Sequence, residues 1–96
     1  MLLVDFYADW CGPCRMLKPV INNLAENYSG RIKIVSVNVD KNRRLSEKYG
    51  VKSVPDVRLF NNGVELERIS GFKKESFYRS RIEAVLHEAG DGAGKF

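Results

Sequence analysis

The two cysteines of this 96-residue chain lie in one short motif, Trp10-Cys11-Gly12-Pro13-Cys14. An apolar run over residues 2–8 precedes the motif, and apolar residues at helical spacing follow it. Two thiols at a Cys-x-x-Cys turn between a strand and a helix can alternate between dithiol and disulfide. A crosslink that closes so small a ring removes little entropy from the unfolded chain, so a structural staple explains it poorly. The motif therefore predicts a redox-active disulfide.

The predicted helix N-terminus gives the two sulfurs different roles. Unpaired backbone N–H groups and the helix dipole stabilise a thiolate at that end. We expect Cys11 to be the exposed nucleophile and Cys14 to be the resolving thiol that attacks the mixed disulfide. Gly12 keeps the approach open, and Pro13 starts the helix without losing a hydrogen-bond donor. The indole of Trp10 either lies beside the sulfur, where it shields it or contacts a substrate, or is simply part of the core.

A carboxylate inside the apolar run, Asp5, is the next candidate. Burying a charge is costly unless the group has a partner or a role. Because Asp5 lies just upstream of the cysteines, it could sit beneath Cys14 and take or give a proton, helped by a raised pKa. Spacing alone leaves equally open a strand-end carboxylate that points to solvent.

The remaining pattern predicts one domain, residues 1–90, and a flexible C-terminal tail, residues 91–96. Strands are expected near 2–8, 32–39, 57–61 and 65–69, and helices near 12–29, 40–49 and 74–88. The first strand, helix and strand form a unit that requires parallel pairing. Asn61-Asn62-Gly63 marks a hairpin. The order βαβαββα indicates an α/β protein, with a mixed four-stranded sheet and helices on both faces.

Composition argues against several function classes. The net charge of +4 is spread over short groups interleaved with acids, so we expect no nucleic-acid partner. No apolar stretch approaches the roughly 20 residues of a membrane span, and no signal peptide is recognisable, so we expect a cytoplasmic protein without membrane contact. A structural zinc site needs four ligands, and the chain adds only His87 to its cysteines. We therefore expect no metal.

These residues resemble the thioredoxin family. Residues 4–14, Val-Asp-Phe-Tyr-Ala-Asp-Trp-Cys-Gly-Pro-Cys, are similar to its active-site segment almost residue for residue, and further matches extend over residues 2–89. The resemblance implies a thioredoxin-like fold and a thiol–disulfide oxidoreductase that reduces disulfides in other proteins, serving electron transport and cell redox homeostasis. It implies no bound cofactor besides the Cys11–Cys14 disulfide. A thioredoxin reductase, dependent on NADPH or on ferredoxin, would restore the dithiol.

The resemblance also places residues around the sulfurs. On general grounds an X-Pro bond is cis in only about 5–6% of cases, so Val54-Pro55 alone predicts a trans bond. The family implies instead that Pro55 is cis and faces the cysteines, and that Asp5 is the buried carboxylate behind Cys14. A protein substrate would lie along Trp10, Gly12, Pro13, Val54, Pro55 and Gly71, with its backbone pairing beside Pro55.

The chain departs from the family pattern in four ways. It starts at what is normally the second strand, so an uncovered sheet edge and face are expected, with a monomer or a weak dimer formed through that face. Ser36 stands where the family usually has a lysine near the buried carboxylate. Asp56 replaces the usual threonine and adds negative charge near the sulfurs. Arg58 falls in a normally apolar strand, and we expect it to be more exposed than Val57 and Leu59.

Two other functions fit the motif. A disulfide oxidase or isomerase would hold its disulfide less tightly and would have a higher reduction potential. A redox-weak binding module would use the same surface to dock a partner, with the sulfur chemistry incidental. The Gly12-Pro13 pair favours the reducing members of the family.

Overall fold

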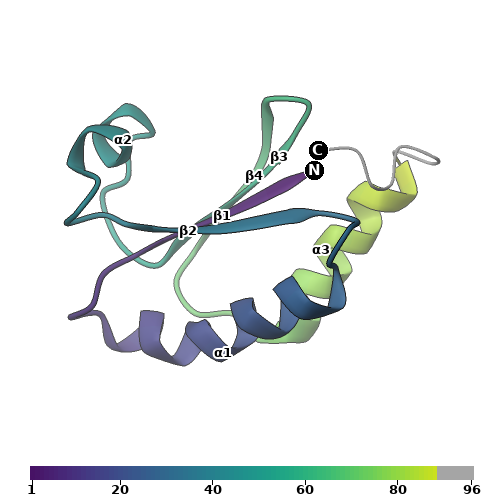
Figure 1. The fold of residues 1–96 in the computed structure, drawn as a ribbon, viewed down its shortest axis with the longest axis horizontal. Coiled ribbons are helices and arrows are strands. Elements are labelled where there is room, and N and C mark those ends of the chain that lie inside the picture. Colours follow the sequence, from purple (N-terminus) through teal and green to yellow (C-terminus); the bar gives the residue numbers. More distant parts are fainter. Residues whose placement is uncertain (89–96) are drawn as a thin grey trace.

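A computed structural model describes residues 1–88, and its four strands and three helices follow one another in the predicted order (Figure 1). The elements are β1 (Leu2–Tyr7), α1 (Gly12–Asn27), β2 (Lys33–Asn38), α2 (Arg43–Lys48), β3 (Asp56–Asn61), β4 (Val64–Ser70) and α3 (Glu75–Glu88). The predicted tail, residues 91–96, and the last two residues assigned to the domain lie outside the described residues.

The four strands form one mixed sheet in the order β2-β1-β3-β4. β1 pairs parallel with β2 and antiparallel with β3, and β3 and β4 form the antiparallel hairpin. In this register Asp5 lies between Ser36 on β2 and Val57 on β3. The mixed sheet is confirmed, and β1, which leads into the cysteine motif, is held on both sides.

Helices α1 and α3 lie on one side of the sheet, as Figure 1 shows, and the main core lies between them and the strands. Successive strand residues point to opposite faces, so Leu3 and Asp5 share the face that these helices cover. Each fully buried apolar side chain contributes roughly 1.5–3 kcal/mol. The stripe of α1 that faces this core holds Cys14, Leu17, Ile21 and Leu24.

The opposite face is only partly covered. Helix α2 lies at one end of it, where the Tyr49 ring centroid is 6.2 Å from that of Phe6 and 6.0 Å from that of Phe60. Beside these rings is a cavity of about 350 Å³ with a largely apolar lining that includes Val4, Val37 and Leu45. Helices on both faces are thus confirmed, and so is the expected uncovered part of one face.

The expectation that Arg58 is exposed was wrong, because Its guanidinium donates from Nε and Nη2 to Asp56, at 3.2 and 3.0 Å, and from Nη1 to Glu65, at 3.1 Å. It also lies over the Phe6 ring, 5.5 Å from the centroid. Arg68 adds a further bond to Asp56, at 3.2 Å. Two guanidinium groups therefore partner the Asp56 carboxylate.

Candidate functional site

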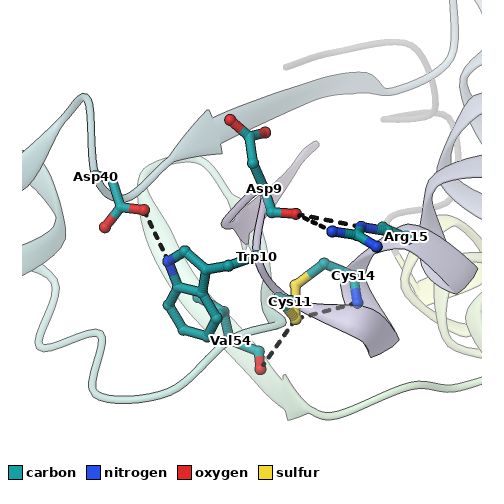
Figure 2. The surroundings of a disulfide bond; sticks show 7 residues. All are labelled: Asp9, Trp10, Cys11, Cys14, Arg15, Asp40 and Val54. Atoms are coloured by element: carbon teal, nitrogen blue, oxygen red, sulfur yellow. Dashed lines mark hydrogen bonds between the residues drawn. A yellow bond between two sulfur atoms is a disulfide. The ribbon is translucent and has the colours of Figure 1, made fainter.

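The two sulfurs lie at the N-terminal end of α1, immediately after the turn that follows β1 (Figure 2). Cys11 is the N-cap residue and forms a disulfide with Cys14, across a Cα–Cα distance of 5.2 Å. Pro13 lies in the first helical turn, where no intrahelical N–H bond is lost. A side chain built at Gly12 would meet no atom within 4 Å, so the space over this residue is open. The predicted disulfide is confirmed.

The backbone of α1 acts directly on Cys11. The Cys14 N–H donates to the Cys11 Sγ over 3.1 Å, which makes the sulfur an N-cap acceptor (Figure 2). The first turn of α1, which the structure describes in full, carries no acidic side chain. Negative charge on Cys11 is therefore favoured by the helix N-terminus and meets no opposing carboxylate within that turn.

Exposure does not distinguish the two cysteines. Cys11 is 4% exposed and Cys14 is 6% exposed, so the expectation of an exposed Cys11 was wrong. Tyr7, Val39 and Val54 pack against the small cluster that contains both residues. The contact that singles out Cys11 is electrostatic, because its sulfur caps the helix.

The loop before β3 meets the disulfide on one side. The Val54-Pro55 bond is cis, as the resemblance implied and against the expectation from general frequencies. The Cys11 Sγ lies 3.6 Å from the Val54 carbonyl oxygen, which would accept from the thiol in the reduced protein (Figure 2). The Gly71 N–H donates to the Pro55 carbonyl over 3.1 Å, and Gly71 has a φ of 79°, which glycine adopts readily. Val54, Pro55 and Gly71 are therefore brought together beside Cys11.

Trp10 is exposed, with 68% of its surface accessible, so the alternative that it belongs to the core was wrong. Its indole N–H donates to Asp40 over 2.9 Å (Figure 2). Arg15 donates twice to the Asp9 carbonyl, at 3.2 and 3.0 Å, and ties the turn to α1. Asp40 belongs to a segment that matched the family, but its role was missed because 30 positions separate it from Trp10.

Asp5 is buried, with 6% of its surface accessible, so the solvent-facing alternative was wrong. It lines a cavity of about 260 Å³ together with Cys14, Lys18 and Ser36. Burial raises the pKa of Asp5 from its ordinary value of 3.8 to about 6, because the charged form loses its hydration. The structure thus places a carboxyl group that titrates near neutrality in the same cavity as Cys14.

A cation also lines this cavity, although Ser36 replaces the usual lysine. Lys18 comes from α1, one turn after Cys14, and shares the lining with Asp5. Sequence reasoning missed Lys18. The signal was its spacing of four residues from Cys14, which places both side chains on neighbouring turns of one helix face.

Within residues 1–88, no group of three or more His, Cys, Asp or Glu side chains is arranged to hold a metal ion. Over the same residues, no helix combines the length and the apolar character that a membrane crossing requires. His87 is exposed in α3. The chemistry of the described site therefore rests on the two sulfurs and the groups around them.

Several known proteins resemble this chain over most of its length. The Thioredoxin family model matches residues 1–84. Thioredoxin 1 of Nostoc sp. is 44% identical over 85 residues, which are 88% of this chain and 79% of that protein. The thioredoxin of Synechocystis sp. is 36% identical over the same shares. The chloroplastic M-type thioredoxin of Pisum sativum is 40% identical over 88% of this chain and 49% of its own length.

A solved structure gives the same likeness in three dimensions. A point-mutant thioredoxin from Halobacterium salinarum NRC-1 superimposes with a TM-score of 0.80 and 42% sequence identity. The matched region covers 86% of this chain and 72% of that one.

The raised pKa of Asp5 makes stability depend on pH. The folded protein binds this proton more tightly than the unfolded chain, so the free energy of unfolding falls as the pH rises from about 4 to 6. The difference between the two pKa values corresponds to about 3 kcal/mol. We expect Asp5→Asn to raise the free energy of unfolding by about 2–3 kcal/mol at pH 7, and the gain should vanish below about pH 4. Urea unfolding measures both, and a gain that is the same at every pH would contradict the assignment.

Proposed function

Because this chain belongs to the thioredoxin family, we propose that Cys11 is its attacking nucleophile and Cys14 its resolving thiol. The protein is a thiol–disulfide oxidoreductase that reduces disulfides in other proteins through a reversible Cys11–Cys14 disulfide. It needs no bound cofactor, since both electrons come from the dithiol. The proposal below concerns which residue performs each step.

Reduction proceeds through two exchanges. The Cys11 thiolate attacks one sulfur of the substrate disulfide, the substrate S–S bond breaks, and the departing substrate thiolate takes up a proton. The Cys14 thiol then loses its proton and attacks the Cys11 sulfur, which releases the second substrate thiolate. Two electrons pass to the substrate, and the Cys11–Cys14 disulfide is formed.

The observation that carries the assignment of Cys11 is the 3.1 Å contact between its Sγ and the Cys14 N–H. A thiolate is the reactive form, and a backbone donor at a helix N-terminus stabilises it. Cys14 lies inside the first turn, where its N–H serves Cys11 and its own sulfur lines the cavity of Asp5.

Asp5 is proposed to accept the proton of Cys14 in the second exchange. Its carboxyl group and Cys14 line the same cavity, and its pKa of about 6 leaves it mostly ionised at pH 7 but still able to hold a proton. Ser36 and Lys18 line the same space and are exposed, so the cavity offers a route to solvent. The proton thus has a path away from the buried sulfur.

The substrate is proposed to lie over the surface formed by Trp10, Gly12, Pro13, Val54, Pro55 and Gly71. Trp10, Gly12 and Pro13 are exposed, and no atom stands over Gly12. Val54 brings its carbonyl next to the Cys11 sulfur. A substrate backbone that pairs beside Pro55 would therefore deliver its disulfide to Cys11.

A thioredoxin reductase is the partner that the family implies. We propose an NADPH- or ferredoxin-dependent enzyme for this role and the cytoplasm as the compartment. We also propose that the protein is a monomer, or at most a weak dimer through the partly uncovered sheet face. The apolar lining of that face supports the dimer.

The cysteine variants test the two roles. Cys11→Ser removes the attacking sulfur, so we expect reduction of insulin disulfides to fall to background. Cys14→Ser leaves attack intact but blocks resolution, so a mixed disulfide with the substrate should accumulate. Non-reducing electrophoresis and mass spectrometry detect that adduct. If Cys11→Ser formed the adduct and Cys14→Ser did not, the roles would be reversed.

Proton acceptance by Asp5 predicts a pH-dependent loss of turnover. We expect Asp5→Asn to slow disulfide reduction roughly 10- to 100-fold at pH 7, and less above about pH 8.5, where free thiols ionise without help. Asp9→Asn is the matched control, because Asp9 is an exposed carboxylate that lines the same cavity. Equal slowing at all pH values, or the same loss in the control, would count against proton transfer.

A further inference from the structure

Two buried side-chain oxygens within residues 1–88 have no hydrogen-bond partner, and they are Asp5 Oδ1 and the Tyr78 hydroxyl. A buried polar atom without a partner costs roughly 1–3 kcal/mol in stability, and native structures hold few of them. Tyr78 lies in α3 and is fully buried. The disulfide mechanism described above uses Asp5 but gives Tyr78 no role.

Both groups lie in the same layer of the molecule. Asp5 shares with Leu3 the sheet face that α1 and α3 cover, and Tyr78 is part of the core on that face. Burial raises the pKa of Tyr78 well above its ordinary value, and the charge of Asp5 raises it further. The phenol therefore senses the carboxylate through a medium of low dielectric constant.

The chemistry of the two groups is complementary. An ionised carboxylate only accepts hydrogen bonds, and a tyrosine hydroxyl that keeps its proton at every working pH is a donor. When Asp5 loses its proton, its need for a donor increases, because a buried charge without one is far more costly than a buried neutral acid.

We propose that Tyr78 is a positioning residue for Asp5, whose hydroxyl donates a hydrogen bond, directly or across one internal water, to the ionised carboxylate. The bond favours the charged form and so keeps the carboxylate available as a proton acceptor at neutral pH. Its consequence for turnover rests on the proposed role of Asp5, whereas the bond itself is a property of the fold.

Other titratable groups near Asp5 must be separated from this effect. On β2 its neighbour Ser36 does not titrate in this range, and on β3 the charged pair Asp56 and Arg58 lies on the opposite face of the sheet. The groups that share the cavity of Asp5 from β1, the turn and α1 are Tyr7, Asp9, Cys14, Arg15 and Lys18. In the oxidised protein Cys14 does not titrate, so the test is made in that state.

The direct test is the titration of Asp5 followed by carboxyl-carbon NMR in the oxidised protein. We expect Tyr78→Phe to raise the midpoint of Asp5 by about one pH unit, because the charged form loses its donor. Tyr28→Phe is the matched control, since it removes a buried hydroxyl that donates to Glu83 over 2.6 Å. The control should leave the midpoint unchanged. An unchanged midpoint in Tyr78→Phe would overturn the proposal.

Urea unfolding of Tyr78→Phe, with and without Asp5→Asn, gives an independent readout. The bond stabilises the folded state only where Asp5 is ionised, so Tyr78→Phe should be more destabilising at about pH 8 than at about pH 4. In the Asp5→Asn background this pH dependence should disappear. A hydroxyl without a partner predicts instead a neutral or stabilising change at every pH, and that result would refute the bond. If the midpoint moves but Asp5→Asn does not slow turnover, the bond stands and proton transfer by Asp5 fails.

Discussion

The placement of the Cys11 sulfur at the N-terminus of α1 is the interaction on which this site depends. One backbone N–H, that of Cys14, lies 3.1 Å from the Cys11 Sγ and belongs to the residue with which Cys11 forms its disulfide. The same turn of helix therefore stabilises negative charge on one sulfur and holds the second within bonding distance. This requires the chain to leave β1 and enter α1 within a few residues. The central position of β1, between β2 and β3, fixes that point in space.

The same architecture explains why a costly residue lies in the middle of the sheet. Asp5 occupies a position on β1 where an apolar side chain would give a more stable protein, and burial makes its ionised form unfavourable. The cavity that joins it to Cys14 gives the carboxyl group a function as a proton acceptor in exchange for that stability. Lys18 at the cavity and Tyr78 in the core approach Asp5 from α1 and α3, so both helices that cover this face take part in its surroundings.

Much of this could be predicted from the sequence, because local signals agreed with the global fold. The apolar run before Cys11, the helical stripe after Cys14 and the Asn62-Gly63 turn gave the order of elements and the disulfide. The errors concern contacts between residues distant in sequence. Arg58 was expected to be exposed, but Asp56, Arg68 and Glu65 pair with it or its partner and satisfy it in a buried position. Cys11 was expected to be exposed, but side chains from three other segments pack against its cluster. General frequencies pointed to a trans Val54-Pro55 bond, and only the family resemblance indicated the cis form.

The competition between the two cysteines for an alkylating agent tests the central assignment most directly. In the reduced protein at neutral pH, iodoacetamide should modify Cys11 at least about tenfold faster than Cys14, because only Cys11 is stabilised as a thiolate by the helix N-terminus. Burial does not favour this result, since Cys11 is no more exposed than Cys14. Mass spectrometry of the peptides over time gives both rates. Faster modification of Cys14, or equal rates at the two sulfurs, would contradict the account.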